Sequence, residues 1–186
     1  MPVVNRRDTE DVSPSRTDGD GGCYTADALA TIAALPRVDE HATTIDARID
    51  VVWPALIEAV DAAFGRAPAA MYARLVGCRD NGSTGPRPLA EGSTTPGFRV
   101  VRVLPGAELV LDGRHRFSSY ALTFCLEAAG RDRSRLRAET RAAFPGRAGA
   151  LYRLLVIGTR GHVVAVRRLL SAVDRASTGS DGALAR

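Results

Sequence analysis

The sequence predicts an α+β domain in which a curved antiparallel β-sheet grips a long C-terminal helix. Between residues 98 and 144, short runs of apolar residues alternate with polar residues and are separated by turn signals, which is typical of antiparallel strands. From about Arg147 to Arg175 the apolar residues instead recur every three or four positions, as on one face of a helix. One or two shorter helices are expected after the first strand.

The 186 residues are enough for one domain with a hydrophobic core, and they suggest four parts. Residues 1–24 are too polar to bury a surface and predict a disordered N-terminal tail. Residues 25–37 predict a short helix and a linker, because their helical composition stops at Pro36. The domain proper is expected to span residues 38–176, followed by a disordered C-terminal tail at 177–186.

Each element of the domain has its own signal. Alternation predicts the first strand at residues 41–49, and a helix with one apolar face follows from Val51 to Phe64. The stretch 77–97 is dominated by Gly, Pro, Ser and Thr, which indicates either a mobile lid or a slack connection. A turn is expected at Asp112-Gly113. Four strands are expected after that connection: residues 98–104, 108–111, 115–128 and 134–144.

The last two strands also predict a register. If Leu126 faces Leu136, the period of two gathers the apolar side chains on one face, while Arg135, Arg137 and Arg141 point to the other, which is interpreted as a solvated sheet face. The inner face of the sheet then holds Tyr120, Leu122, Phe124, Leu126, Leu136, Ala138, Thr140, Ala142 and Phe144. The inward stripe of the last helix holds Leu151, Leu154, Leu155, Gly158, His162, Ala165, Val166, Leu169 and Val173.

Composition excludes several classes of function. All 25 basic residues are Arg, yet aromatic residues make up only 5% of the chain, so no nucleic-acid partner is expected. No apolar run is long enough to cross a membrane, and residues 1–22 lack the apolar core of a secretory signal. The three cysteines are odd in number and lack CxxC spacing, which indicates free thiols and therefore predicts a protein of the reducing cytoplasm. Nucleotide-binding, nucleophile-elbow and zinc-protease motifs are absent, so neither a metal nor a cofactor is expected.

Three segments together have a pattern known from one superfamily: TIDARIDVVWPALIEAV at 44–60, YALTFCLEAAGRDRSRLRAET at 120–140, and the closing helix. They resemble the START-like, or SRPBCC, superfamily, whose helix-grip fold is found in polyketide cyclases and lipid-transfer domains. The likeness covers about Asp39 to Arg175 and lies in patterns that determine the fold. It implies a cavity for a hydrophobic ligand between the sheet and the last helix.

Eight residues are candidates for contact with that ligand. His162 lies on the inward stripe beside two glycines, although a histidine in such a place is more often held by a hydrogen bond inside the helix–sheet interface. Tyr120, Thr140 and Tyr152 have hydroxyls that suit a ligand carbonyl. The remaining candidates are Arg114 and His115 at a strand start, which suit an acidic head group, and Trp53 and Phe124, which either line the cavity or fill it.

The predicted function is the carriage or sequestration of a small hydrophobic molecule such as a lipid, an isoprenoid or a polyketide. One alternative is a cyclase or aromatase that uses the same cavity, with His162, Tyr120 or Tyr152 moving a proton. A second alternative is a module that acts through protein contacts. The sequence assigns no catalytic residue, and either a monomer or a homodimer is expected.

Overall fold

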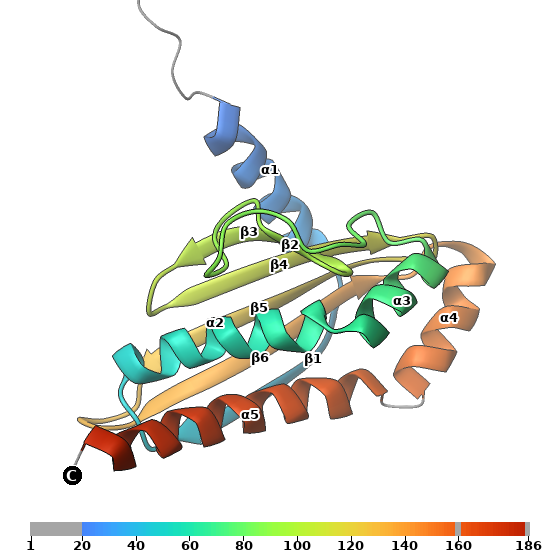
Figure 1. Ribbon diagram of the computed structural model, residues 1–186. Coiled ribbons are helices and arrows are strands. Elements are labelled where there is room, and N and C mark those ends of the chain that lie inside the picture. Colours follow the sequence, from blue (N-terminus) through green and yellow to red (C-terminus); the bar gives the residue numbers. More distant parts are fainter. Residues whose placement is uncertain (1–19, 159–160, 185–186) are drawn as a thin grey trace, which may run out of the picture.

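The computed structural model describes residues 20–158 and 161–184 and contains one six-stranded antiparallel sheet (Figure 1). The strands lie in the order β1-β6-β5-β4-β3-β2, so the first strand pairs with the last. The predicted class, a curved antiparallel sheet with a long C-terminal helix, is confirmed. The strands are β1 (Arg37–Ile45), β2 (Thr94–Thr95), β3 (Phe98–Leu104), β4 (Glu108–His115), β5 (Ser118–Ala128) and β6 (Ser134–Ala143).

Helices cover both faces of this sheet. In Figure 1, α2 and α5 run across one face, called the inner face here, while α3 and α4 lie at one end of it. On the outer face, Ile32 of α1 packs against Val101 and Val110. The helices are α1 (Asp20–Ala34), α2 (Ile49–Gly65), α3 (Ala67–Val76), α4 (Gly146–Gly158) and α5 (Gly161–Leu184).

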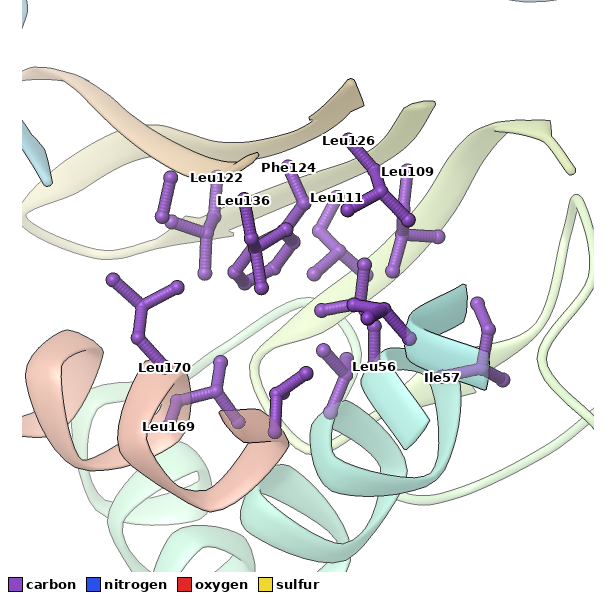
Figure 2. Close-up of a cluster of buried hydrophobic side chains, with 14 of the residues drawn as sticks. Leu56, Ile57, Leu109, Leu111, Leu122, Phe124, Leu126, Leu136, Leu169 and Leu170 are labelled. Atoms are coloured by element: carbon purple, nitrogen blue, oxygen red, sulfur yellow. The ribbon is translucent and has the colours of Figure 1, made fainter. Parts of the chain in front are cut away.

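Large aliphatic side chains fill one half of the inner face. Figure 2 shows Leu111, Phe124 and Leu136 of the sheet facing Leu56 of α2 and Leu169 of α5. Phe124, Leu56 and Leu136 are all fully buried. Burial of one such side chain stabilises the fold by about 1.5–3 kcal/mol, so this half of the interface holds the two helices against the sheet.

The predicted register of the β5–β6 hairpin is confirmed, because Leu126 pairs with Leu136. The arginines of β6 consequently lie on the outer face. There Arg141 pairs with Glu139 and also donates hydrogen bonds to the carbonyls of Ala33 and Leu35, which holds the end of α1 against the sheet.

The predicted turn at Asp112-Gly113 is wrong, because β4 continues to His115. Gly113 is needed for space. It pairs with Tyr120 on β5, and a Cβ atom at Gly113 would lie 2.3 Å from the carbonyl oxygen of Gly97 and 2.4 Å from the Tyr120 ring. Glycine inside a strand can mark such a close approach instead of a turn.

The C-terminal helix differs from its prediction. It is divided into α4 and α5 near Gly158 and Gly161, and glycine is a weak helix former. The predicted inward stripe is buried at Val166, Leu169 and Val173 of α5, whereas Leu151 and Leu154 of α4 are 70% and 71% exposed.

The described chain also differs from the expected tails at both ends. α5 continues to Leu184, over residues for which the sequence predicts a tail, and the buried Ser177 hydroxyl donates to the carbonyl of Val173. α1 begins at Asp20, inside the range 1–24 for which a tail was expected, and the rest of that range lies outside the described residues.

The connection 77–97 is tied to the domain at several points. Arg87 pairs with Asp61 of α2 at 2.8 Å and donates to the carbonyl of Thr94, and Leu89 is buried in the core. The end of this segment enters the sheet as β2. It is therefore part of the wall of the domain. None of the described helices has the length and apolar character needed to span a bilayer.

Candidate functional site

A cavity of about 660 Å³ occupies the half of the inner face that the leucines leave free. Its walls come from α2, α3, α4, α5 and the strands. Many of the lining residues are small, among them Ala63, Ala73, Ala142, Gly161 and Ala165. Where small side chains face one another across the sheet–helix interface, they leave a space between the sheet and the helices. The volume is within the range of pockets that hold small-molecule ligands, which is about 300–1,000 Å³.

Aromatic rings form much of the cavity wall. Phe64 and Phe98 lie with ring centres 4.5 Å apart, and Phe98 meets Tyr120 edge-on at 5.2 Å. His115 meets Tyr152 edge-on at 4.8 Å. Such contacts fix ring positions, so this wall is shaped before a ligand enters.

Tyr120 is a structural tie within this wall. Its hydroxyl donates to the carbonyl of Gly97 at 2.7 Å and lies 3.6 Å from Sγ of Cys78. Burial raises the pKa of Tyr120 far above its ordinary value and also raises the pKa of Cys78, so both groups stay neutral. The Tyr120 proton is used by the backbone and is not free for a ligand carbonyl.

His115 has its inner nitrogen fixed by the backbone. The N–H of Phe117 donates to Nδ1 of His115 at 3.1 Å, so the neutral ring carries its proton on Nε2. Burial lowers the pKa of His115. Within the described residues Nε2 makes no hydrogen bond, and the ring lines the cavity. His115 therefore offers one N–H donor to a ligand.

Tyr72 of α3 and Tyr152 of α4 meet through their hydroxyls at the edge of the cavity. Burial raises the pKa of Tyr152. Since only one of the two protons can lie between the oxygens, the other hydroxyl proton remains available. The pair both joins the two helices and adds a donor to the wall.

A polar cluster lies between β1 and α5. Nε2 of His162 is 2.7 Å from Oδ2 of Asp39, and Nε2 of His41 is 3.4 Å from the same oxygen. Thr140, which lines the cavity, is the cross-strand neighbour of Asp39. Asp39 Oδ1, His41 Nε2 and Thr140 Oγ1 are buried and make no hydrogen bond to another described residue. Buried polar atoms normally have a partner, so this cluster has capacity for a ligand group or water.

The structure brings five of the eight candidate residues together at the cavity and places three elsewhere. Those that line it are His115, Tyr120, Thr140, Tyr152 and His162. Phe124 is fully buried among the leucines, and Arg114 is exposed on the outer face because strand alternation turns it away from His115. Trp53 borders a separate open depression at the other end of the sheet, with Arg48, Arg131 and Arg133.

Three residues of the site were not singled out from the sequence: Asp39, His41 and Tyr72. The two on β1 sit in the polar run DEH, which suggests an exposed edge. Counting in steps of two back from Ile45, however, puts Thr43, His41 and Asp39 on its buried face. Among the described residues, no group of three His, Cys, Asp or Glu side chains is arranged to hold a metal ion.

Solved structures with a similar course of the chain include CalU16 from Micromonospora echinospora, at 19% identity and a TM-score of 0.47 over 82% of this chain and 94% of that one. Truncated norcoclaurine synthase from Thalictrum flavum is similar at 13% identity and a TM-score of 0.47, over 76% of this chain and 94% of the synthase. A conserved protein from Geobacillus kaustophilus gives 12% and 0.46 over 76% and 95%. No protein-family model and no curated protein matches the chain. At this level of likeness the structures assign neither a family nor a ligand.

Proposed function

We propose that the protein binds a small hydrophobic molecule, such as a lipid, an isoprenoid or a polyketide, in the cavity between the sheet and α5, as its resemblance to the START-like superfamily implies. The observation that carries the proposal is the cavity itself, about 660 Å³ of space with a mainly apolar wall. An apolar ligand gains about 25 cal/mol for each Å² that it removes from water there.

A few polar groups favour a ligand with one polar end. The Nε2 proton of His115 and the spare hydroxyl proton of the Tyr72–Tyr152 pair are donors, and Thr140 Oγ1 has no partner among the described residues. Donors of this kind suit a carbonyl or hydroxyl oxygen on an otherwise apolar molecule. In an apolar pocket, a small number of polar groups fixes the orientation of the ligand, while the apolar wall supplies most of the affinity.

Native mass spectrometry of the purified full chain tests the proposal, together with titration by the neutral apolar dye Nile red. We expect an adduct that disappears on denaturation, and saturable dye binding. Ala63→Phe, which fills the cavity from α2, should abolish both, whereas Ala62→Phe, its exposed neighbour, should not. Equal dye binding by the two variants, or none by the wild type, would contradict a ligand cavity.

A second candidate function is proton transfer on the bound molecule, and the contact between His162 and Asp39 favours it. A carboxylate that accepts a hydrogen bond from a histidine fixes the orientation and the tautomer of the ring, which is how a general base is held. His162 itself lines the cavity. The substrate class would be a polyketide-like molecule whose cyclisation needs removal of a proton.

His162→Gln and Asp39→Asn separate the two functions. A cyclase should lose turnover of a polyketide-like substrate in both variants while Nile red affinity stays within about twofold, since binding is mainly apolar. A carrier should show no turnover to lose. Neither residue is replaced by Lys or Arg, because a new charge would then be buried in a cluster that is largely shielded from water.

A further inference from the structure

We propose that the end of the molecule formed by α3, α4 and the first turn of α5 docks on an anionic lipid surface. This interaction goes beyond ligand binding in the cavity and does not depend on it. It begins with the exposed large apolar side chains of the described residues, which gather at this end apart from Leu104 of β3. We call them the apolar rim: Met71, Leu75, Leu151, Leu154 and Val164.

Four of the five residues of the apolar rim lie on two helices that are in contact, α3 and α4. Met71 and Leu75 are four residues apart on α3 and so share one face, and both are more than 70% exposed. Leu151 and Leu154 repeat this on α4 at a spacing of three. The Tyr72–Tyr152 contact holds the two helices side by side, as Figure 1 also shows. Isolated exposed leucines are ordinary, but a cluster on neighbouring helices marks an interaction surface.

The stretches of sequence that carry the apolar rim have charges of one sign. The sequence contains no Asp or Glu from Ala62 to Arg79 or from Thr140 to Val173, while it contains three Arg in the first stretch and six in the second. Arg74 on α3 and Arg153 on α4 are exposed, and neither forms an ion pair with another described residue. Elsewhere arginines commonly have acidic partners, as Arg99 has Asp80 at 2.7 Å.

Apolar side chains flanked by arginines complement an anionic bilayer. The leucines can enter the acyl boundary while the guanidinium groups remain among the phosphates. Two copies of this chain joined by their rims would instead place arginines against arginines, which is unfavourable. The charge pattern thus selects lipid over a second copy.

The cavity reaches the surface at the same end. Tyr72 and Gly161 line the cavity and are themselves exposed, so they form part of its edge next to the apolar rim. Docking here would place that edge against the bilayer. If the cavity holds a hydrophobic ligand, as proposed above, the ligand could pass between membrane and protein without crossing water.

Vesicle flotation of the ligand-free full chain tests the docking. We expect binding to phosphatidylcholine vesicles that contain phosphatidylglycerol, weaker binding to phosphatidylcholine alone, and release by added salt. Leu75→Ser/Leu151→Ser should weaken binding by about tenfold or more, because two side chains no longer enter the acyl boundary. Leu104→Ser, at the exposed end of β3, is the matched control and should bind as the wild type does.

Charge is tested in the same assay. Arg74→Ala/Arg153→Ala should lose about fivefold for each arginine removed. Arg131→Ala/Arg133→Ala, which removes the same charge from the β5–β6 hairpin, should change binding little. Equal loss in both double variants, equal binding to neutral vesicles, or no binding at all would overturn the proposal. So would dimerisation that Leu75→Ser/Leu151→Ser abolishes in the absence of vesicle binding. None of these results depends on Nile red uptake, so docking and ligand binding fail separately.

Discussion

His115 shows how one backbone contact decides what a side chain can do. Because Phe117 donates to Nδ1, the ring keeps its own proton on Nε2, on the side that has no protein partner among the described residues. A second proton would have to enter at Nδ1 and break that hydrogen bond. The residue is therefore a neutral donor, suited to holding an oxygen atom and unsuited to holding an acidic head group by charge.

The burial of His115 predicts that the stability of the protein depends on pH. The pKa of His115 is lowered in the folded state, so the unfolded chain takes up the proton first as the pH falls. His115 has no effect on the free energy of unfolding well above its ordinary pKa of about 6.5, and it lowers that free energy as the pH drops toward the folded-state pKa. Urea denaturation of His115→Gln between about pH 7 and pH 5 should give a shallower decrease than the wild type. Parallel curves would show that the histidine is solvated.

Gly113 is a residue at which the addition of one methyl group should lower the stability of the fold. A Cβ atom there has no room beside Gly97 and the Tyr120 ring. Gly113→Ala should lower the free energy of unfolding by about 1–3 kcal/mol and weaken Nile red binding, because Tyr120 is displaced from the wall. Gly179→Ala, at a helical position with open space around it, should be neutral or stabilising by up to about 1 kcal/mol. Similar destabilisation by both would contradict the close packing at Gly113.

At the level of elements, the strands could be predicted better than the helices at the C-terminus. The β5–β6 register follows from a period of two, because a slip of one residue would bury Arg135 and Arg137. The helical period, in contrast, runs unbroken through Gly158 and Gly161, so the sequence does not reveal where α4 ends and α5 begins. The spacing of apolar residues in the sequence does not show whether the apolar face of α4 is covered, because that depends on tertiary contacts.

The division between α4 and α5 has a direct test. Leu169→Ala should lower the free energy of unfolding by about 2–5 kcal/mol, because its side chain is buried against the sheet. Leu154→Ala, on the apolar rim, should change it by less than about 0.5 kcal/mol. Chemical denaturation of the two variants measures both values. A large loss for Leu154→Ala would show that α4 packs inward in solution.

The candidate site could be predicted in part, namely where its residues lie on strands with a period of two. His115, Tyr120 and Thr140 follow from strand alternation once the inner face is known. The partner of His162 does not, because Asp39 lies 123 positions away and meets α5 only in the folded chain. Aromatic character alone was a poor guide, since Phe124 fills the core and Trp53 lies at the opposite end.

For the whole molecule, an empty cavity is a loss of packing that a ligand can restore. A ligand that binds only the folded chain, present at about 100 times its Kd, raises the free energy of unfolding by about 2.7 kcal/mol. Thermal unfolding with saturating Nile red should show this increase in the wild type and in Ala62→Phe, and should not show it in Ala63→Phe. An increase of equal size in all three would place the dye outside the cavity.

The pairing of the first strand with the last also governs when the cavity comes into existence. Arg37 pairs with Arg141, and α5 follows β6, so the inner face of the sheet is closed only once β6 and α5 have been made. A ribosome that has made the chain only as far as β5 has produced a sheet in which β1 has no partner strand and which lacks α5, one of the two helices that cover its inner face. Ligand capture is thus deferred until β6 and α5 have been made, and until then the apolar surface of the incomplete sheet depends on fast folding or on chaperones to avoid aggregation.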